Sequence, residues 1–293
     1  MSGRAPQVAG GQTLYVVATP VGNLRDITLR ALDILAAVDV VAAEDTRLTG
    51  SLLRHHGIST RLLSLHEHNE AQRAKEIVAL LAQGKRVALV SDAGTPAISD
   101  PGARLVRAIH DAGYTVAPLP GPCAVAAAVS AAGLDAERFV FLGFLPFQAG
   151  ARRRLIETIA PLPLALVLFE APHRVRDTVI ELARVISAPR TLIVARELTK
   201  MHETITRMSL HEAASWFDAD ANRARGELVL ILDAPQAPDR SQEVLSAEGE
   251  RWLRALLEEL PPARAARVVA AVAGAPRDEV YARALAIRPA SDR

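Results

Sequence analysis

Short runs of aliphatic residues alternate with longer amphipathic segments through the first 119 residues of this chain. The runs are rich in Val, Leu and Ala and predict buried strands at residues 14–19, 38–43, 61–65, 87–90 and 114–118. The segments between them predict helices at residues 27–37, where Thr28 is a candidate cap, and at 48–55, 69–83 and 100–112. Such alternation is typical of parallel βαβ units, so we expect an α/β domain over residues 13–119.

A sharp turn at residues 119–122 (LPGP) separates this region from a second one. Two prolines and a glycine cannot continue a helix or a strand, and they mark a domain boundary. The second region, residues 120–235, repeats the alternation of strands and helices. Its predicted strands are residues 139–143, 164–170, 191–196 and 227–232. Its predicted helices are residues 123–132, 151–159, 175–186 and 210–217.

Beyond a polar, proline-marked linker at residues 233–241 the pattern becomes purely helical. Helices are predicted at residues 243–259, 263–273 and 277–285, with Gly274 as the stop signal and Pro276 as the restart. Residues 240–293 are therefore expected to form a small helical appendage with the rhythm of a helix-turn-helix. The nine Arg and eight acidic residues of this segment provide no dense positive face, so a packing or dimerisation role stands beside nucleic-acid binding.

The composition limits which classes of protein this chain can belong to. The 293 residues are half apolar, enough for two ordinary domains and a small third. A formal net charge of +1 argues against a generic polyanion binder. Arg far outnumbers Lys among the 34 basic residues, which the base composition of the genome explains better than selection for phosphate contacts. With six Phe, three Tyr and two Trp, any nucleic-acid contact is expected to rely on Arg and shape rather than on long stacking surfaces.

Localisation follows from the cysteine count and the hydropathy pattern. Cys123 is the only cysteine, so no intramolecular disulfide can form and a reducing compartment, the cytoplasm, is expected. The first twelve residues carry no apolar segment, and charged residues interrupt every long apolar run. We therefore expect neither export nor a membrane span.

Residues 91–102 (SDAGTPAISDPG) are the most informative stretch of the chain. They follow a buried strand, and the carboxyl ends of parallel strands are where open α/β sheets bind ligands. Gly94 and Gly102 allow close approach of backbone to a ligand, while Asp92 and Asp100 can accept hydroxyl or ammonium donors. The alternative is a tight surface turn with solvated acids, but the segment is longer than a simple strand-to-helix connection needs.

Familiar catalytic signatures are missing from the sequence. It contains no G-x-G-x-x-G after the first strand, no phosphate-binding P-loop, no H-E-x-x-H and no cysteine pair. His66, Glu67 and His68 could put two imidazoles on one face, but zinc needs further ligands that the sequence does not place. We interpret this cluster as a solvated loop and predict no metal site.

Eight short motifs remain, and their order is distinctive. They are residues 18–28, 44–47 (EDTR), 91–102, 120–124 (PGPCA), 143–146 (GFLP), 170–174 (EAPHR), 196–200 (RELTK) with Glu203, and 225–227 (RGE). In this order they resemble the tetrapyrrole-methylase-like (class III) S-adenosylmethionine methyltransferases, and within that family the members that methylate a ribose 2′-oxygen of ribosomal RNA. The resemblance covers roughly residues 14–232 and, more loosely, the helical tail.

The resemblance implies a two-domain α/β enzyme with the cofactor cleft between its domains, usually a homodimer. It implies transfer of a methyl group from S-adenosylmethionine to a cytidine in the decoding region of 16S ribosomal RNA. The sequence leaves open whether the substrate is naked RNA or the assembled small ribosomal subunit, and the near-neutral net charge favours the subunit. Carried onto this chain, the donor-binding residues are Pro20, Gly22, Asp92, Ala93, Gly94, Thr95, Cys123, Ala124, Phe169, Glu170, Leu198, Gly226, Glu227 and Leu228. Relatives often carry Ser at the position of Cys123, which argues against an essential side-chain hydroxyl there.

Methyl transfer from a sulfonium to an oxygen neutralises charge as the transition state forms, so an apolar cleft is no handicap. In-line orientation supplies much of the catalysis, and a strong base is not essential. If a base assists, Glu44, Asp45 and Glu197 are the candidates, with Arg47 and Lys200 holding phosphates or carboxylates. For each of these charged residues, an interdomain salt bridge is the structural alternative.

Six arginines are the candidate RNA contacts. They are Arg25, Arg152, Arg153, Arg154, Arg174 and Arg196. The run at 152–154 can be an RNA-phosphate clamp or one face of a solvated helix.

Three other functions compete with this hypothesis. A tetrapyrrole-type, small-molecule methylase of the same fold is the nearest, although the EDTR and PHR motifs argue against it. A dinucleotide oxidoreductase would need a phosphate-cradling glycine loop, which residues 20–23 do not provide. A non-catalytic ribosome-binding scaffold would leave the donor pocket unexplained.

Overall fold

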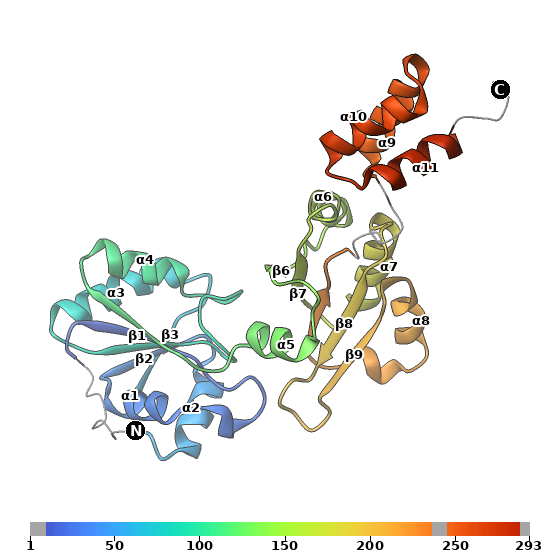
Figure 1. The fold of residues 1–293 in the computed structure, drawn as a ribbon. Helices are drawn as coiled ribbons and strands as arrows, with labels where there is room; N and C mark the ends of the chain where they lie inside the picture. Colours follow the sequence, from blue (N-terminus) through green and yellow to red (C-terminus); the bar gives the residue numbers. More distant parts are fainter. Residues whose placement is uncertain (1–9, 236–244, 288–293) are drawn as a thin grey trace, which may run out of the picture. The chain divides into compact units, whose positions relative to one another are not determined.

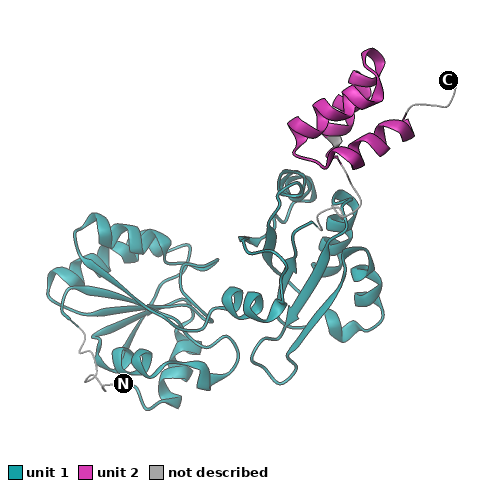
Figure 2. Cartoon of the chain, viewed as in Figure 1, with its two compact units in different colours: residues 1–235 teal, residues 236–293 magenta. Residues whose placement is uncertain are grey.

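The computed structural model describes residues 10–235 and 245–287 (Figure 1). The chain divides into two compact units, residues 1–235 and 236–293 (Figure 2). The first unit holds both predicted α/β regions, and the boundary between them at residue 120 stays a prediction. Most of the predicted linker 233–241, the start of the tail at residue 240 and the start of its first helix at 243 lie outside the described residues.

The first sheet is parallel throughout. Its strands are β1 (Thr13–Val17), β2 (Val40–Ala43), β3 (Arg61–Ser64), β4 (Val87–Val90) and β5 (Thr115–Leu119), in the order β3-β2-β4-β1-β5. Every neighbouring pair runs in the same direction. The strands β2 and β4 are buried on both faces, as their continuous apolar sequences require. The predicted parallel α/β arrangement of this region is confirmed.

Helices cover both faces of this sheet (Figure 1). The helices α1 (Leu29–Ala37) and α2 (Thr46–His55) pack on one face, and α3 (Glu70–Ala82) and α4 (Ala103–Asp111) pack on the other. The predicted cap of α1 is present, since the Thr28 hydroxyl accepts the Ala31 N–H at 3.1 Å. A short 3-10 turn, η1 (Leu24–Asp26), lies in the loop that follows β1.

The second sheet is mixed, which corrects the parallel pattern that the sequence suggested. It contains β6 (Phe139–Phe144), β7 (Ala165–Glu170), β8 (Thr191–Arg196), β9 (Thr204–Ser209) and β10 (Leu228–Leu232), in the order β6-β7-β10-β8-β9. Only β6 and β7 pair in parallel; the other neighbours are antiparallel. The sequence analysis missed β9, because this edge strand (TITRMS) is mostly exposed and carries few apolar residues.

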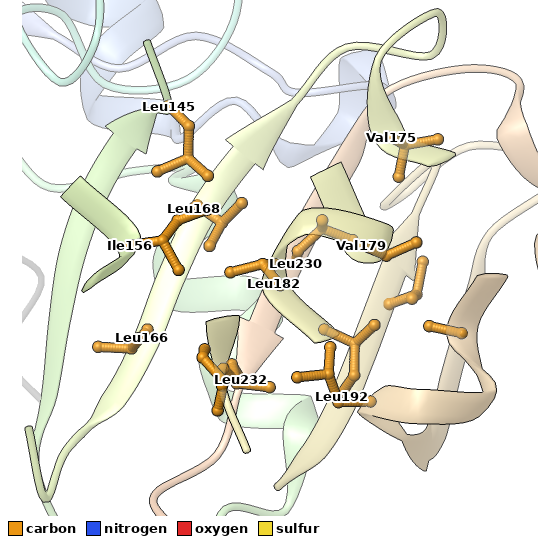
Figure 3. Packing of buried hydrophobic residues seen from close by; sticks show 14 of the residues in the cluster. Leu145, Ile156, Leu166, Leu168, Val175, Val179, Leu182, Leu192, Leu230 and Leu232 are labelled. Carbon is orange, nitrogen blue, oxygen red and sulfur yellow. The ribbon is translucent and has the colours of Figure 1, made fainter. Parts of the chain in front are cut away.

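Alternate residues of the second sheet feed two cores. One face packs on α6 (Ala149–Ile159), α7 (Val175–Val185) and α8 (Ala213–Asp218), where Leu168, Leu230 and Val179 interdigitate (Figure 3). The other face packs on α5 (Ala124–Ala132) through Val167, Ile193 and Ile231. The predicted helix at 210–217 begins as a 3-10 turn, η2 (Leu210–Glu212), and a second turn, η3 (Ala221–Ala224), precedes β10.

The second unit is a three-helix module with its own core. It comprises α9 (Ala247–Glu259), α10 (Pro262–Ala273) and α11 (Arg277–Ile287). Leu253, Val269 and Val280 are fully buried among these helices. Gly274 ends α10 in the left-handed conformation (φ +66°), as predicted for the stop signal. Within residues 10–235 and 245–287, no helix is long and apolar enough to cross a membrane.

Candidate functional site

A cavity of about 340 Å³ lies where the loop after β4, the start of α5 and the ends of β6 and β7 meet. The loop after β8 and the start of β10 complete its wall. Most of the residues predicted to bind a methyl donor line it: Ala93, Gly94, Thr95, Cys123, Ala124, Phe169, Glu170, Leu198, Glu227 and Leu228. The cavity therefore joins segments from both predicted domains, spread along the sequence from Val21 to Val229.

The loop at residues 91–102 forms one side of the cavity and has a defined backbone. Gly94 exchanges two hydrogen bonds with Thr19, at 2.9 and 3.0 Å, which ties the loop to the end of β1. Four of its residues have positive φ, and two of these, Ala97 (+65°) and Ser99 (+64°), are not glycines. Left-handed backbone at residues with a Cβ persists only where the surroundings hold it, so this segment is more than a solvated turn.

A buried carboxylate holds the end of this loop. One oxygen of Glu70, whose residue is only 5% exposed, accepts the backbone N–H groups of Gly102, Arg104 and Leu105 at 3.0, 2.9 and 3.1 Å. These donors are the unpaired amides at the start of α4, where Gly102 has no side chain to cap them. Glu70 begins α3, so it acts as a cap supplied from a neighbouring helix.

Four carboxylates gather where β2 and β4 end. Glu44 and Asp45 follow β2, Asp92 and Asp100 follow β4, and the Asp45 N–H donates to Asp92 at 2.8 Å. Burial, reinforced by the negative charges of Asp92, Asp100 and Asp45, raises the pKa of Glu44. Burial also raises the pKa of Asp100, which lines the cavity. This edge of the site is thus suited to a cationic or hydroxyl-bearing ligand.

Asp45 and Arg47 form a local pair. The Asp45 carboxylate caps α2 by accepting the Arg47 N–H at 2.8 Å, and it pairs with the Arg47 guanidinium at 2.6 Å. The hydrogen bonds from Arg47 lower the pKa of Asp45 to about 2, so this carboxylate is a poor proton acceptor at neutral pH. Among the three candidate bases, Glu44 alone has a raised pKa.

Glu197 and Lys200 form a second charged group after β8. The Lys200 ammonium contacts Glu197 at 2.9 Å and Glu227 at 3.2 Å, and Glu197 also accepts the Glu227 N–H at 2.8 Å. Burial opposes ionisation of both side chains, but the hydrogen bonds and opposite charges outweigh it. The pKa of Glu197 is therefore lowered and that of Lys200 is raised. All three residues belong to the second region. Within the described part of the chain, no ion pair joins residues 10–119 to residues 120–235, against the alternative of an interdomain salt bridge.

The predicted donor residues that do not line the cavity are Pro20, Gly22, Asp92 and Gly226. The two glycines among them, Gly22 and Gly226, allow close packing of the chain beside the cavity. A Cβ on Gly22 would lie 2.5 Å from Lys200 Cγ and 2.8 Å from the Leu198 carbonyl oxygen, and one on Gly226 would overlap the Glu197 side chain. Gly22 thus lets the loop after β1 approach the loop after β8.

Three of the six predicted RNA contacts are occupied within the protein. Arg152 pairs with Glu181 at 3.3 Å, and Arg196 donates to Thr204 and to the carbonyls of Arg225 and His202. Arg174 pairs with the buried Glu170 at 3.3 Å and donates to the Leu145 carbonyl at 2.8 Å. Arg25, Arg153 and Arg154 are exposed, although Arg153 also contacts Glu181.

Sequence reasoning missed several lining residues. These are Val21, Ile98, Ser99, Phe144, Ala171, Pro172, Ala195 and Val229. Asp100 also lines the cavity, and the sequence had indicated it as an acceptor in the ligand-binding loop. Most of the missed residues lie within or next to the eight motifs, so their position beside a motif was the signal that could have identified them. Phe144 and Phe141 both pack edge-on against Phe169, at ring-centroid distances of 5.6 and 5.0 Å, and together they form an aromatic wall. The alternation of apolar and polar residues along the strands could not predict this cluster.

The described residues hold no group of three His, Cys, Asp or Glu side chains arranged for a metal ion. His66 and His68 lie edge to face at 6.0 Å, and the His66 ring contacts the Asn69 amide at 3.0 Å. The cavity instead suits an organic ligand that carries both apolar and polar groups, because apolar side chains, backbone and a few carboxylates line it.

Comparisons with known proteins give matches along most of the chain. The model of the tetrapyrrole (corrin/porphyrin) methylases matches residues 13–214, and that of the RsmI C-terminal HTH domain matches residues 243–288. Ribosomal RNA small subunit methyltransferase I of Escherichia coli O157:H7 is 47% identical over 272 residues, covering 93% of this chain and 94% of that protein. The protein of the same name from Haemophilus influenzae is 45% identical over 268 residues, covering 92% and 94%.

Solved structures share the fold of the first unit. The cobalt precorrin-4 methyltransferase CbiF superposes with a TM-score of 0.58 at 18% identity, covering 78% of this chain and 97% of its own. A uroporphyrin-III C-methyltransferase from Thermus thermophilus has a TM-score of 0.54 at 20% identity, covering 76% and 94%. At these identities the likeness concerns the fold alone.

Proposed function

The chain belongs to the tetrapyrrole methylases and, within them, to the family of ribosomal RNA small subunit methyltransferase I, and from this premise we propose its reaction. It transfers a methyl group from S-adenosylmethionine to the ribose 2′-oxygen of a cytidine in the decoding region of 16S ribosomal RNA. The substrate is the RNA within the small ribosomal subunit, the enzyme works as a homodimer, and the reaction takes place in the cytoplasm.

The cavity is the observation that carries this proposal. Its volume of about 340 Å³ and its mixed lining fit a nucleoside with an amino-acid tail. Gly94 and Ala93 present backbone rather than bulky side chains, while Phe169 and Leu198 supply apolar surface. Asp100 and the neighbouring Glu44 favour the positive charge and the ribose hydroxyls of such a ligand.

When bound, S-adenosylmethionine would supply an electrophilic methyl group on a sulfonium. The protein's task is then to orient the incoming oxygen and to exclude water, which the apolar wall of Phe144 and Phe169 favours. Of the three candidate bases, Glu44 alone has a raised pKa, and it lies near Asp100, which lines the cavity, although Glu44 itself does not. Lys200 keeps the loop after β8 in place through Glu197 and Glu227.

The test is a methyl-transfer assay with labelled S-adenosylmethionine on small ribosomal subunits from cells that lack this protein. Nuclease digestion and mass spectrometry of the nucleosides then locate the label. Label on a cytidine ribose is the expected result. Label on a base would keep the methyltransferase and contradict the 2′-oxygen assignment. Donor binding without RNA labelling would favour the small-molecule methylase instead, and failure to bind the donor would favour a ribosome-binding scaffold.

A further inference from the structure

Two phenylalanines at and just after the end of β6 are exposed. Phe144 lines the cavity and is 53% exposed, and Phe147 in the next loop is 78% exposed. The chain has only six phenylalanines, and leaving Phe144 and Phe147 exposed forgoes the stabilisation that burial of an aromatic side chain gives. Exposed aromatic side chains grouped at the mouth of a site are typical of a binding surface.

The ring of Phe147 has a rigid, positively charged support. The guanidinium of Arg174 lies 5.7 Å from the ring centroid, within the range of a cation–π contact. Arg174 is itself fixed, because it donates to the Leu145 carbonyl at 2.8 Å and pairs with Glu170, which is buried and also hydrogen-bonded to Thr178. A ring held in this way can accept a flat partner with little loss of side-chain entropy.

Arginines also follow this ring along the chain. Arg152 donates to the Phe147 carbonyl at 3.4 Å, so the first turns of α6 adjoin the loop, and these turns also carry the exposed Arg153 and Arg154. An exposed aromatic ring among arginines matches the chemistry of an unpaired RNA strand, whose bases stack on aromatic rings and whose phosphates take guanidinium groups.

We propose that Phe147, supported by Arg174, is a base-stacking site for an unpaired nucleotide of the RNA that enters the cavity. The inference rests on the proposed function, which makes RNA the substrate. A second copy of the chain is a less suitable occupant. A twofold contact over Phe147 would bring Arg153 and Arg154 of one copy toward the same residues of the other, and like charges at an interface are repulsive.

The test compares four variants in steady-state methylation of small ribosomal subunits from cells that lack this protein. Stacking on an aromatic side chain is worth about 1–3 kcal/mol per base, which corresponds to a factor of about 5 to 150. Phe147→Ala should therefore raise KM for the subunit roughly tenfold, with kcat and the donor Kd changed less than about twofold. Phe147→Trp should stay close to the parent, whereas Phe147→Leu should behave like the Ala variant because it has no π face. Phe139→Ala removes an exposed ring at the opposite end of β6 and should leave KM unchanged.

Several results would overturn the inference. An unchanged KM in Phe147→Ala, or full recovery in Phe147→Leu, would show that no base stacks there. A drop in oligomer mass of Phe147→Ala in sedimentation would show that a second copy covers the ring. Filter binding of a short single-stranded RNA separates this inference from the proposed function. If the parent methylates no RNA yet Phe147→Ala still weakens RNA binding roughly tenfold, the reaction is wrong and the stacking site stands; equal binding by both would refute the site.

Discussion

The Glu70 carboxylate is expected to be a main determinant of the proposed donor site, although it lies outside the cavity. Its oxygen accepts three backbone N–H groups at 2.9 to 3.1 Å and is the cap of α4. A single side-chain cap contributes about 1 kcal/mol, and each buried donor left without a partner costs about 1–3 kcal/mol. Water can satisfy some of the exposed amides, so we expect Glu70→Ala to lower the free energy of unfolding by about 3 kcal/mol.

The consequence for function follows from the position of this cap. The three amides lie at the end of the loop 91–102, whose backbone includes Ala97 and Ser99 in the left-handed region. Without the cap, that loop should relax and the donor affinity should fall roughly tenfold. Glu70→Gln keeps one acceptor oxygen without the charge, so it should lose about half as much stability.

Urea unfolding and calorimetric titration with S-adenosylmethionine measure the two effects. Glu76→Ala is the matched control, since Glu76 lies on the same helix and pairs with Arg73 at a partly exposed site. An exposed pair of this kind contributes about 0.3–0.5 kcal/mol, so this variant should be nearly neutral. A Glu70→Ala protein within about 0.5 kcal/mol of the parent and with parental donor affinity would refute the reasoning.

Three further predictions concern residues of the site. The pKa of Glu44 is raised in the folded protein, so ionisation of this carboxyl lowers the free energy of unfolding as the pH rises above about 4.5. Glu44→Gln should therefore be more stable than the parent in urea at pH 7.5 and equally stable near pH 4. The same difference in stability at both pH values would contradict this. Cys123 is the residue before α5, and its side chain makes no capping hydrogen bond to the helix. A hydroxyl at this position can cap the helix, so Cys123→Ser should raise the free energy of unfolding by about 1 kcal/mol and keep the donor affinity. A loss of donor affinity would mean that the thiol itself contributes to binding. Gly22→Ala should cost about 1–3 kcal/mol and weaken donor binding because its Cβ meets the Leu198 carbonyl. Gly150→Ala is the control: it lies in a helix, where its Cβ would make only an ordinary contact with Arg154 at 3.7 Å, so it should be neutral or stabilising. Equal effects of the two in thermal unfolding would argue against close packing at Gly22.

Local sequence patterns were sufficient for the elements whose burial is regular. The strands β2 and β4 are continuous apolar runs, and they were predicted because a strand covered on both faces needs apolar residues at every position. Gly274 and Thr28 act at helix ends through their own backbone or hydroxyl, so their roles also followed from the sequence. The ordered motifs identified the family for the same reason, since each is a short segment with its own chemistry.

Tertiary structure decided what depends on contacts between distant segments. The sequence could not show that Glu70 caps α4, because its partners lie more than 30 residues away. It also could not separate Arg196 and Arg152, which are engaged inside the protein, from the exposed Arg154, since all carry the same charge in the sequence. The antiparallel β9 was missed because edge strands lack the apolar signal of buried ones. Sequence alone was enough for the family, for most of the elements and for somewhat more than half of the cavity lining. Pairing direction, charge partners and exposure were set by which segments meet in space.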